Sequence, residues 1–204
     1  MASLAMHLAI AEEYMKRNAV QDRNLFLDGS LAPDLGSDQI ASHFGSYEKP
    51  KTIIEFLKTR MNLAKYLEEV QISNDFDSGY FLHMIADDLF YQYLYTEEVE
   101  SKTPEQIRKE VYSDYDFVTQ HILSFYKIET DRIKKWSNNK KGKPVYFTPQ
   151  GCDAFIAAVS KVDLQKAERE IRADLSSFRE NFFKSNKIKT RRQIFHSSRP
   201  KISS

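Results

Sequence analysis

The stretch that decides the fold is Gly79-Tyr80-Phe81-Leu82-His83-Met84-Ile85-Ala86-Asp87-Asp88. His83 and Asp87 are four residues apart, so on a helix they project from one face, one turn apart. Their neighbours are mostly large and apolar: Phe81, Leu82, Met84, Ile85, Leu89 and Phe90. Such a helix should be buried, and a buried imidazole beside a buried carboxylate needs a partner such as a metal ion.

Helical spacing of apolar residues continues on both sides of this stretch. A stripe of Leu4, Leu8, Ala11 and Met15 predicts a first helix with His7 beside the stripe. We expect further helices over residues 50–70, from 73 or 75 to about 95, 103–126, a short one from 148, and 163–184. The 103–126 helix opens on a capping box of Thr103 and Gln106, and an interruption near Ser113 is left open. Residues 24–45, with Gly29, Pro33 and Gly36, are predicted to form a long connection, a feature that is often functional.

Composition agrees with a helical domain. The chain has 204 residues, of which 41% are hydrophobic and 29% charged, and it contains only six glycines and six prolines. Few turn-forming residues argue against an all-β sandwich. We therefore expect an all-α fold, a single-domain bundle of roughly seven helices over residues 1–184, followed by a basic, loosely held tail over 185–204.

Several classes of protein are disfavoured by the same counts. The net charge of +1 gives no overall attraction to nucleic acid or to an anionic membrane. The single cysteine, Cys152, excludes an intrachain disulfide framework. No apolar run approaches the ~18–20 residues that span a bilayer, and residues 1–17 lack the basic start of a signal peptide. A cytoplasmic location is the expectation.

Imidazoles and carboxylates in the first half of the chain form a candidate metal site. His7, His43 and His83 all fall within the first 90 residues, each with apolar neighbours, and Asp34 follows Pro33. Imidazole and carboxylate suit zinc and its divalent neighbours. A lone histidine in an apolar stretch is more often a hydrogen-bonded core residue, so the hypothesis depends on the repetition of the pattern at three places. We predict that these side chains and Asp87 converge on a common cation.

The order of these motifs resembles the zinc-dependent phospholipase C family, which is related to the single-strand-specific zinc nucleases. The resemblance covers about the first 95 residues and is carried by residues 6–11 (Met-His-Leu-Ala-Ile-Ala), 26–34 (Phe-Leu-Asp-Gly-Ser-Leu-Ala-Pro-Asp), 42–44 (Ser-His-Phe) and the stretch 79–83 with Asp87. It implies a helical phosphoesterase that binds one or two zinc-like ions and activates water.

The resemblance also implies roles for single residues. Asp34, His43 and His83 would ligate one ion, and Asp87 would bridge to a second ion held by His7. Asp34 and Asp87 would be the catalytic carboxylates, and the i,i+4 spacing to His83 favours Asp87 over Asp88. The implied substrate is a phosphate-ester small molecule or a lipid head group. Nucleic acid is compatible with these ligands but not indicated.

This chain also departs from the family pattern. The secreted enzymes use a freshly cleaved amino terminus as a ligand, which is not expected here, and Tyr93 stands where they carry a further histidine. A third metal site is therefore predicted to be missing, although Asp114, Asp116 and His121 could replace it unless they form a solvated helix face. Lys140, Lys141 and Lys143 could reach an anionic substrate or simply be solvated, and Tyr91, Tyr93 and Tyr95 could line a pocket or belong to the core.

Two other functions remain open from the sequence. One is a non-catalytic helical interaction module that keeps a structural metal or none, for which the basic tail could dock an acidic partner, a membrane surface or RNA. Its cationic residues are Lys187, Lys189, Arg191, Arg192, Arg199 and Lys201. The other is a helical phosphohydrolase of the HD type, which ranks low because the chain contains no adjacent His-Asp pair.

Overall fold

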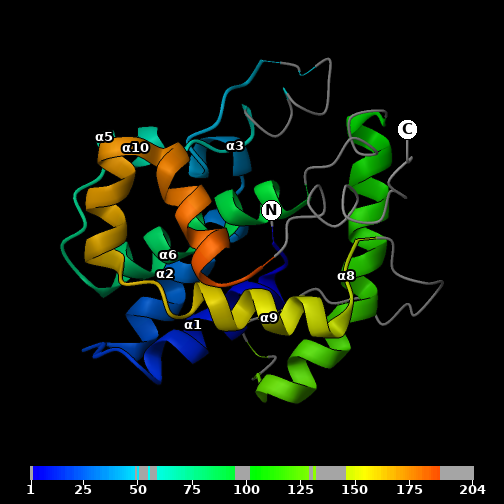
Figure 1. Cartoon of the computed structure of the whole chain (residues 1–204), viewed down its shortest axis with the longest axis horizontal. Coiled ribbons are helices and arrows are strands. Elements are labelled where there is room, and N and C mark those ends of the chain that lie inside the picture. Colours follow the sequence, from blue (N-terminus) through cyan, green and yellow to red (C-terminus); the bar gives the residue numbers. More distant parts are fainter. Residues whose placement is uncertain are drawn as a thin grey trace, which may run out of the picture.

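The computed structural model describes residues 2–48, 50, 55, 59–94, 102–128, 131 and 146–188, and none of these lies in a strand (Figure 1). The helices are α1 (Leu4–Met15), α2 (Arg23–Leu35), α3 (Gln39–Ser42), α5 (Leu63–Glu69), α6 (Asp75–Leu94), α8 (Pro104–Tyr126), α9 (Pro149–Val159) and α10 (Leu164–Ser185). The predicted all-α class is confirmed for this part of the chain. No described helix combines the length and the apolar character needed to cross a bilayer.

Helix α6 lies at the centre of the core. Every residue from 81 to 90 is buried, as the apolar sequence of this segment predicts. Helix α2 packs along α6, and α1, α5 and α10 also contact it. In Figure 1 the α5–α10 pair and α8 stand at opposite sides of the view, with α2 and α6 between them.

Two glycines bring the backbones of α2 and α6 into contact. A Cβ atom on Gly29 would lie 2.0 Å from the carbonyl oxygen of Phe76, and one on Gly79 would lie 2.0 Å from that of Phe26. Any side chain would therefore collide with main-chain atoms of the opposite helix. This close crossing places Ser30, the residue after Gly29, directly against His83.

The long connection predicted over residues 24–45 is wrong, because most of it is helical. Asp22 caps α2 by accepting a hydrogen bond from the amide of Leu25. Pro33 lies in the last turn, two residues before the helix ends, so it interrupts little of the hydrogen-bond ladder. The short helix α3 follows after Gly36, and only the turns around it remain irregular.

The single helix predicted over residues 50–70 is also wrong. Residues 60–62 are not helical, and Asn62 caps a separate helix, α5, by accepting from the amide of Lys65. The amide of Asn62 is bonded to the carbonyl oxygen of His43 at 2.9 Å, which holds this break beside the candidate site. Residues 51–54 and 56–58, which include the predicted inner face of that helix, lie outside the described residues.

The other predicted helix starts fare better. The capping box of Thr103 and Gln106 is present, α8 is not interrupted near Ser113, and Thr148 and Asp163 cap α9 and α10 as predicted. At α6 the amide of Asp77 is bonded by Asn74, not by Ser73 or Asp75. The predicted Lys140–Lys143 loop, Tyr95 and the tail beyond residue 188 lie outside the described residues.

A kink divides α10 at Asp174, whose backbone is extended (φ −163°, ψ 101°). Its carboxylate accepts hydrogen bonds from the amides of Ser176 and Ser177, as an N-cap does at a new helix start. The second half of α10 thus begins as a helix of its own and packs Phe178, Phe182 and Phe183 into the core.

Candidate metal centre

The five residues predicted to ligate metal lie together in the core. They are supplied by α1 (His7), α2 (Asp34), the end of α3 (His43) and α6 (His83 and Asp87). The three histidines and Asp87 are at most 2% exposed, and the side chain of Asp34 is 7% exposed. Burial of so many polar groups requires that their hydrogen-bonding capacity be met inside the protein.

Backbone carbonyls fix the orientation of two of the imidazoles. His43 Nδ1 lies 2.7 Å from the carbonyl oxygen of Gln39, and His83 Nδ1 lies 2.8 Å from that of Ser30. A carbonyl oxygen can only accept, so both rings donate through Nδ1. In their neutral forms, both rings therefore present a lone pair at Nε2. Metal-ligating histidines are oriented in this way in proteins.

The two Nε2 atoms point at each other across only 3.1 Å. Two lone pairs at this distance repel unless a cation lies between them. Asp34 Oδ1 is 3.5 Å from His43 Nε2, and Asp87 Oδ2 is 3.2 Å from His43 Nε2 and 3.6 Å from His83 Nε2. Ligand atoms of a tetrahedral zinc ion with bonds of 2.0–2.1 Å are separated by about 3.3–3.4 Å. The donors present fit such an ion.

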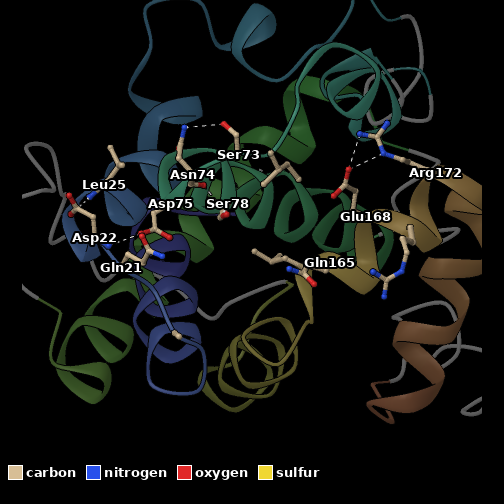
Figure 2. A pocket seen from close by; sticks show the side chains of 14 residues that line it. Gln21, Asp22, Leu25, Ser73, Asn74, Asp75, Ser78, Gln165, Glu168 and Arg172 are labelled. Atoms are coloured by element: carbon tan, nitrogen blue, oxygen red, sulfur yellow. Dashed lines mark hydrogen bonds and ion pairs between the residues drawn. The ribbon is translucent and has the colours of Figure 1, made fainter.

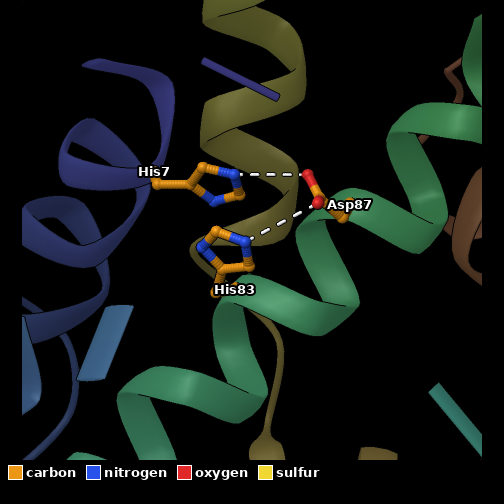
Figure 3. Close-up of side chains that lie close together, drawn as sticks. All are labelled: His7, His83 and Asp87. Atoms are coloured by element: carbon orange, nitrogen blue, oxygen red, sulfur yellow. Dashed lines mark ion pairs between the residues drawn. The ribbon is translucent and has the colours of Figure 1, made fainter. Parts of the chain in front are cut away.

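His7 covers the other side of this group (Figure 3). Its ring stacks on that of His83, with centroids 3.6 Å apart and planes at 11°. His7 Nε2 lies 3.2 Å from Asp87 Oδ1 and 3.9 Å from Asp34 Oδ2. The backbone amide of Ala2 donates to Asp87 Oδ1 at 2.6 Å.

Four buried atoms of this cluster have no hydrogen-bond partner: both ring nitrogens of His7, Asp34 Oδ1 and Asp87 Oδ2. An unsatisfied buried polar group costs about 1–3 kcal/mol, and more when it is charged. Orphaned atoms of this kind converge on one place here, which is the arrangement expected of metal ligands.

The surroundings favour the protonation states that bind metal. Burial raises the pKa of Asp34 and lowers that of His83, which keeps the His83 imidazole neutral. Burial alone would raise the pKa of Asp87, but the hydrogen-bonding imidazoles of His43, His7 and His83 contribute to holding it well below the usual range. At His43 burial acts to lower the pKa, and the Asp87 and Asp34 carboxylates outweigh it and raise it.

The neighbouring carboxylate, Asp88, has a different environment. Its two oxygens receive Nε and a terminal nitrogen of Arg179 from α10, the first at 2.7 Å. Asp88 is thereby neutralised on the opposite side of α6. The choice of Asp87 over Asp88 agrees with this geometry.

The predicted substitute for a third metal site is not assembled in the structure. Asp114 accepts the backbone amides of Tyr146 and Phe147, so it fastens the segment before α9 to α8. His121 contacts both oxygens of Asp153 at 2.9–3.0 Å instead. Among the described residues, the groups with metal-ligand spacing are His7–His83–Asp87 and Asp34–His43–His83. Tyr91 is a core residue, and Tyr93 packs against Phe155.

Sequence reasoning missed the partners that orient the site. The carbonyls of Ser30 and Gln39 carry no side-chain signal, and Arg179 lies far along the chain. Only the paired glycines, each shortly before a site residue, hinted at the close crossing that delivers the Ser30 carbonyl.

A separate pocket of about 750 Å³ lies between the amino-terminal ends of α2, α6 and α10 (Figure 2). Its lining is polar and includes Asp22, Asp75, Glu168 and Arg172. None of the five clustered residues contributes to it. Asp75 accepts the amide of Asp22, and Arg172 pairs with Glu168, so these groups already satisfy one another.

No family model, curated protein or solved structure matches this chain. Functional inference therefore depends on the geometry of the cluster and on the motif resemblance.

Proposed function

We propose that this protein is a metal-dependent hydrolase of phosphate esters, a phospholipase C-like phosphodiesterase with a helical fold of the phospholipase C and zinc nuclease type. The observation that carries the proposal is the pair of carbonyl-anchored imidazoles, His43 and His83, whose Nε2 atoms face each other between two buried carboxylates. One or two divalent ions, zinc by the donor set, are the proposed cofactor. A bound ion of this kind would lower the pKa of water toward roughly 7 and polarise a phosphoryl oxygen.

The residues of the cluster have distinct tasks in this proposal. His43 and His83 are held rigidly by main-chain carbonyls, so they fix the geometry. Asp87 lies at the base of the cluster, on the buried helix α6. Asp34 has the most exposed side chain of the five, so substrate and water would approach from its side. A phosphate-ester small molecule or a lipid head group is the proposed substrate, and the lone buried thiol fits a reducing compartment such as the cytoplasm.

A second function is favoured by the burial of the cluster. Structural zinc sites are closed by four protein ligands, whereas catalytic sites keep a position open for water. In the second proposal the metal therefore holds α1, α2, α3 and α6 together in a non-catalytic interaction module.

Hydrolysis assays on matched variants distinguish the two functions. The chelator-treated and zinc-loaded chains are assayed with chromogenic phosphate mono- and diesters and with phosphatidylcholine. The hydrolase proposal predicts turnover only in the zinc-loaded chain and its loss in His83→Ala. His121→Ala, which alters the described histidine outside the cluster, should retain it. A zinc-loaded chain that binds the metal, hydrolyses none of these esters and loses its helical structure on chelation would support the structural function.

A further inference from the structure

We infer that the centre holds a single divalent ion, ligated by His43, His83, Asp34 and Asp87, and that His7 covers the centre without ligating. The inference rests on the proposed metal centre and specifies its composition. It replaces the second ion that the family resemblance implies for His7.

The first argument is that His83 can serve one ion only. Its Nδ1 donates to the carbonyl of Ser30, so a single lone pair, at Nε2, remains for a metal. Both groups with metal-ligand spacing include His83. They therefore describe one centre from two sides and cannot be filled independently.

The second argument is the way in which the carboxylate oxygens divide. Asp34 Oδ1 and Asp87 Oδ2 face His43 Nε2 at 3.5 and 3.2 Å. The remaining oxygens, Asp34 Oδ2 and Asp87 Oδ1, face His7 Nε2, but Asp87 Oδ1 already accepts the amide of Ala2. A second ion would find one imidazole and two oxygens there, one of them engaged.

The third argument is charge balance. Metal-ligating imidazoles are neutral, so the buried cluster carries the two negative charges of Asp34 and Asp87. Asp88 is neutralised separately by Arg179. One divalent ion makes the centre neutral, whereas two would leave an uncompensated double positive charge in the core, which is strongly unfavourable.

The orientation of His7 supports the same conclusion. Ligating histidines donate their other ring nitrogen to a carbonyl, carboxylate or water. His43 and His83 do so, but His7 Nδ1 has no hydrogen-bond partner. Its ring instead lies flat on His83, as a cover would.

Zinc titration of the chelator-treated full chain, by calorimetry and by elemental analysis after dialysis, tests the inference. We expect one zinc per chain. His7→Phe keeps a ring on His83 without any nitrogen, and it should still bind one ion with less than a 100-fold loss of affinity. His43→Ala should bind none. The visible spectrum of the Co²⁺ form, which reports the ligand set, should be the same in wild type and His7→Phe.

Two zinc ions per wild-type chain would overturn the inference and leave the proposed hydrolase standing. Loss of zinc or an altered Co²⁺ spectrum in a helical His7→Phe chain would also overturn it. If His7→Phe does not fold, as judged by circular dichroism, His7→Gln replaces it with the same criteria. A folded wild-type chain that binds no zinc would overturn both the inference and the proposed function.

Discussion

At the scale of single residues, adjacent carboxylates on α6 have unrelated tasks. Asp87 faces three imidazoles, while Asp88 is paired with one guanidinium on the opposite side of the helix. Because successive helix positions differ by about 100°, one residue of shift exchanges a metal ligand for a structural ion pair.

This difference predicts opposite phenotypes for two isosteric variants. Asp87→Asn should remove zinc binding and leave the chain folded, because it deletes a charged ligand. Asp88→Asn should keep zinc binding but lower the free energy of unfolding by about 1–3 kcal/mol, because Arg179 loses a charged partner. Calorimetric zinc titration and urea denaturation measure the two effects. Equal zinc affinity in both variants would contradict the assignment.

Much of the site is predictable at this scale, because histidine and aspartate are rare in buried apolar sequence and stand out there. The structure brings all five predicted residues together, although their metal-binding roles stay predictions. The carbonyls of Ser30 and Gln39 could not be predicted, since every residue has a carbonyl and only tertiary packing selects the one that is used. The pairing of His121 with Asp153 was missed for a similar reason: it joins two helices.

At the scale of secondary-structure elements, the crossing of α2 and α6 positions the site. Gly29 and Gly79 let the two backbones touch, and the carbonyl of Ser30 thereby reaches His83 Nδ1. Tyr80, next to Gly79, donates to the carbonyl of Ser42 and so fastens the end of α3 beside His43.

Alanine at these glycines should force the two helices apart. We expect Gly79→Ala to lower the free energy of unfolding by about 3 kcal/mol or more, because the added methyl group meets main-chain atoms that cannot yield. Zinc affinity should fall as well, since His83 loses its carbonyl anchor.

Gly36→Ala is the matched control for this change. The nearest atom to a Cβ at Gly36 is 3.7 Å away, and its φ of −64° suits alanine. Its stability in urea should change by less than about 1 kcal/mol. If Gly79→Ala were as stable as Gly36→Ala, the close crossing would not be what holds the site.

Helix starts were predictable where a side chain caps the first turn, as at Thr103, Thr148 and Asp163. Helix α2 was missed because Gly29 and Pro33 are unfavourable in an isolated helix. Packing against α6 overrides that local preference, since the glycine that weakens the helix is what allows the contact. The break before α5 was missed because the amide of Asn62 is satisfied by His43, a contact between distant segments.

At the scale of the whole molecule, the core encloses several ionisable groups in their neutral form. Burial raises the pKa of Tyr80 and of Tyr146 to about 12, and that of the Cys152 thiol to about 12. In the unfolded chain these groups ionise at lower pH, so above their ordinary pKa values the unfolded state binds fewer protons than the folded state. Stability must then fall as the pH rises.

We therefore predict a loss on the order of 2 kcal/mol in the free energy of unfolding between pH 8 and pH 11. Urea denaturation at the two pH values measures it. Cys152 should also react with a thiol reagent only when the chain is unfolded, because its thiolate is suppressed by burial. Equal stability at both pH values, or a thiol that reacts quickly in the folded chain, would show that these groups are not buried as described.

The measurement that tests the central claim most directly is anomalous X-ray scattering at the zinc edge from crystals of the zinc-loaded protein. We predict a single strong peak bounded by His43 Nε2, His83 Nε2, Asp34 and Asp87, with His7 stacked on His83 beside it. A map without a peak there, in a crystal that shows the same five side chains gathered together, would contradict the claim that this cluster is a metal centre.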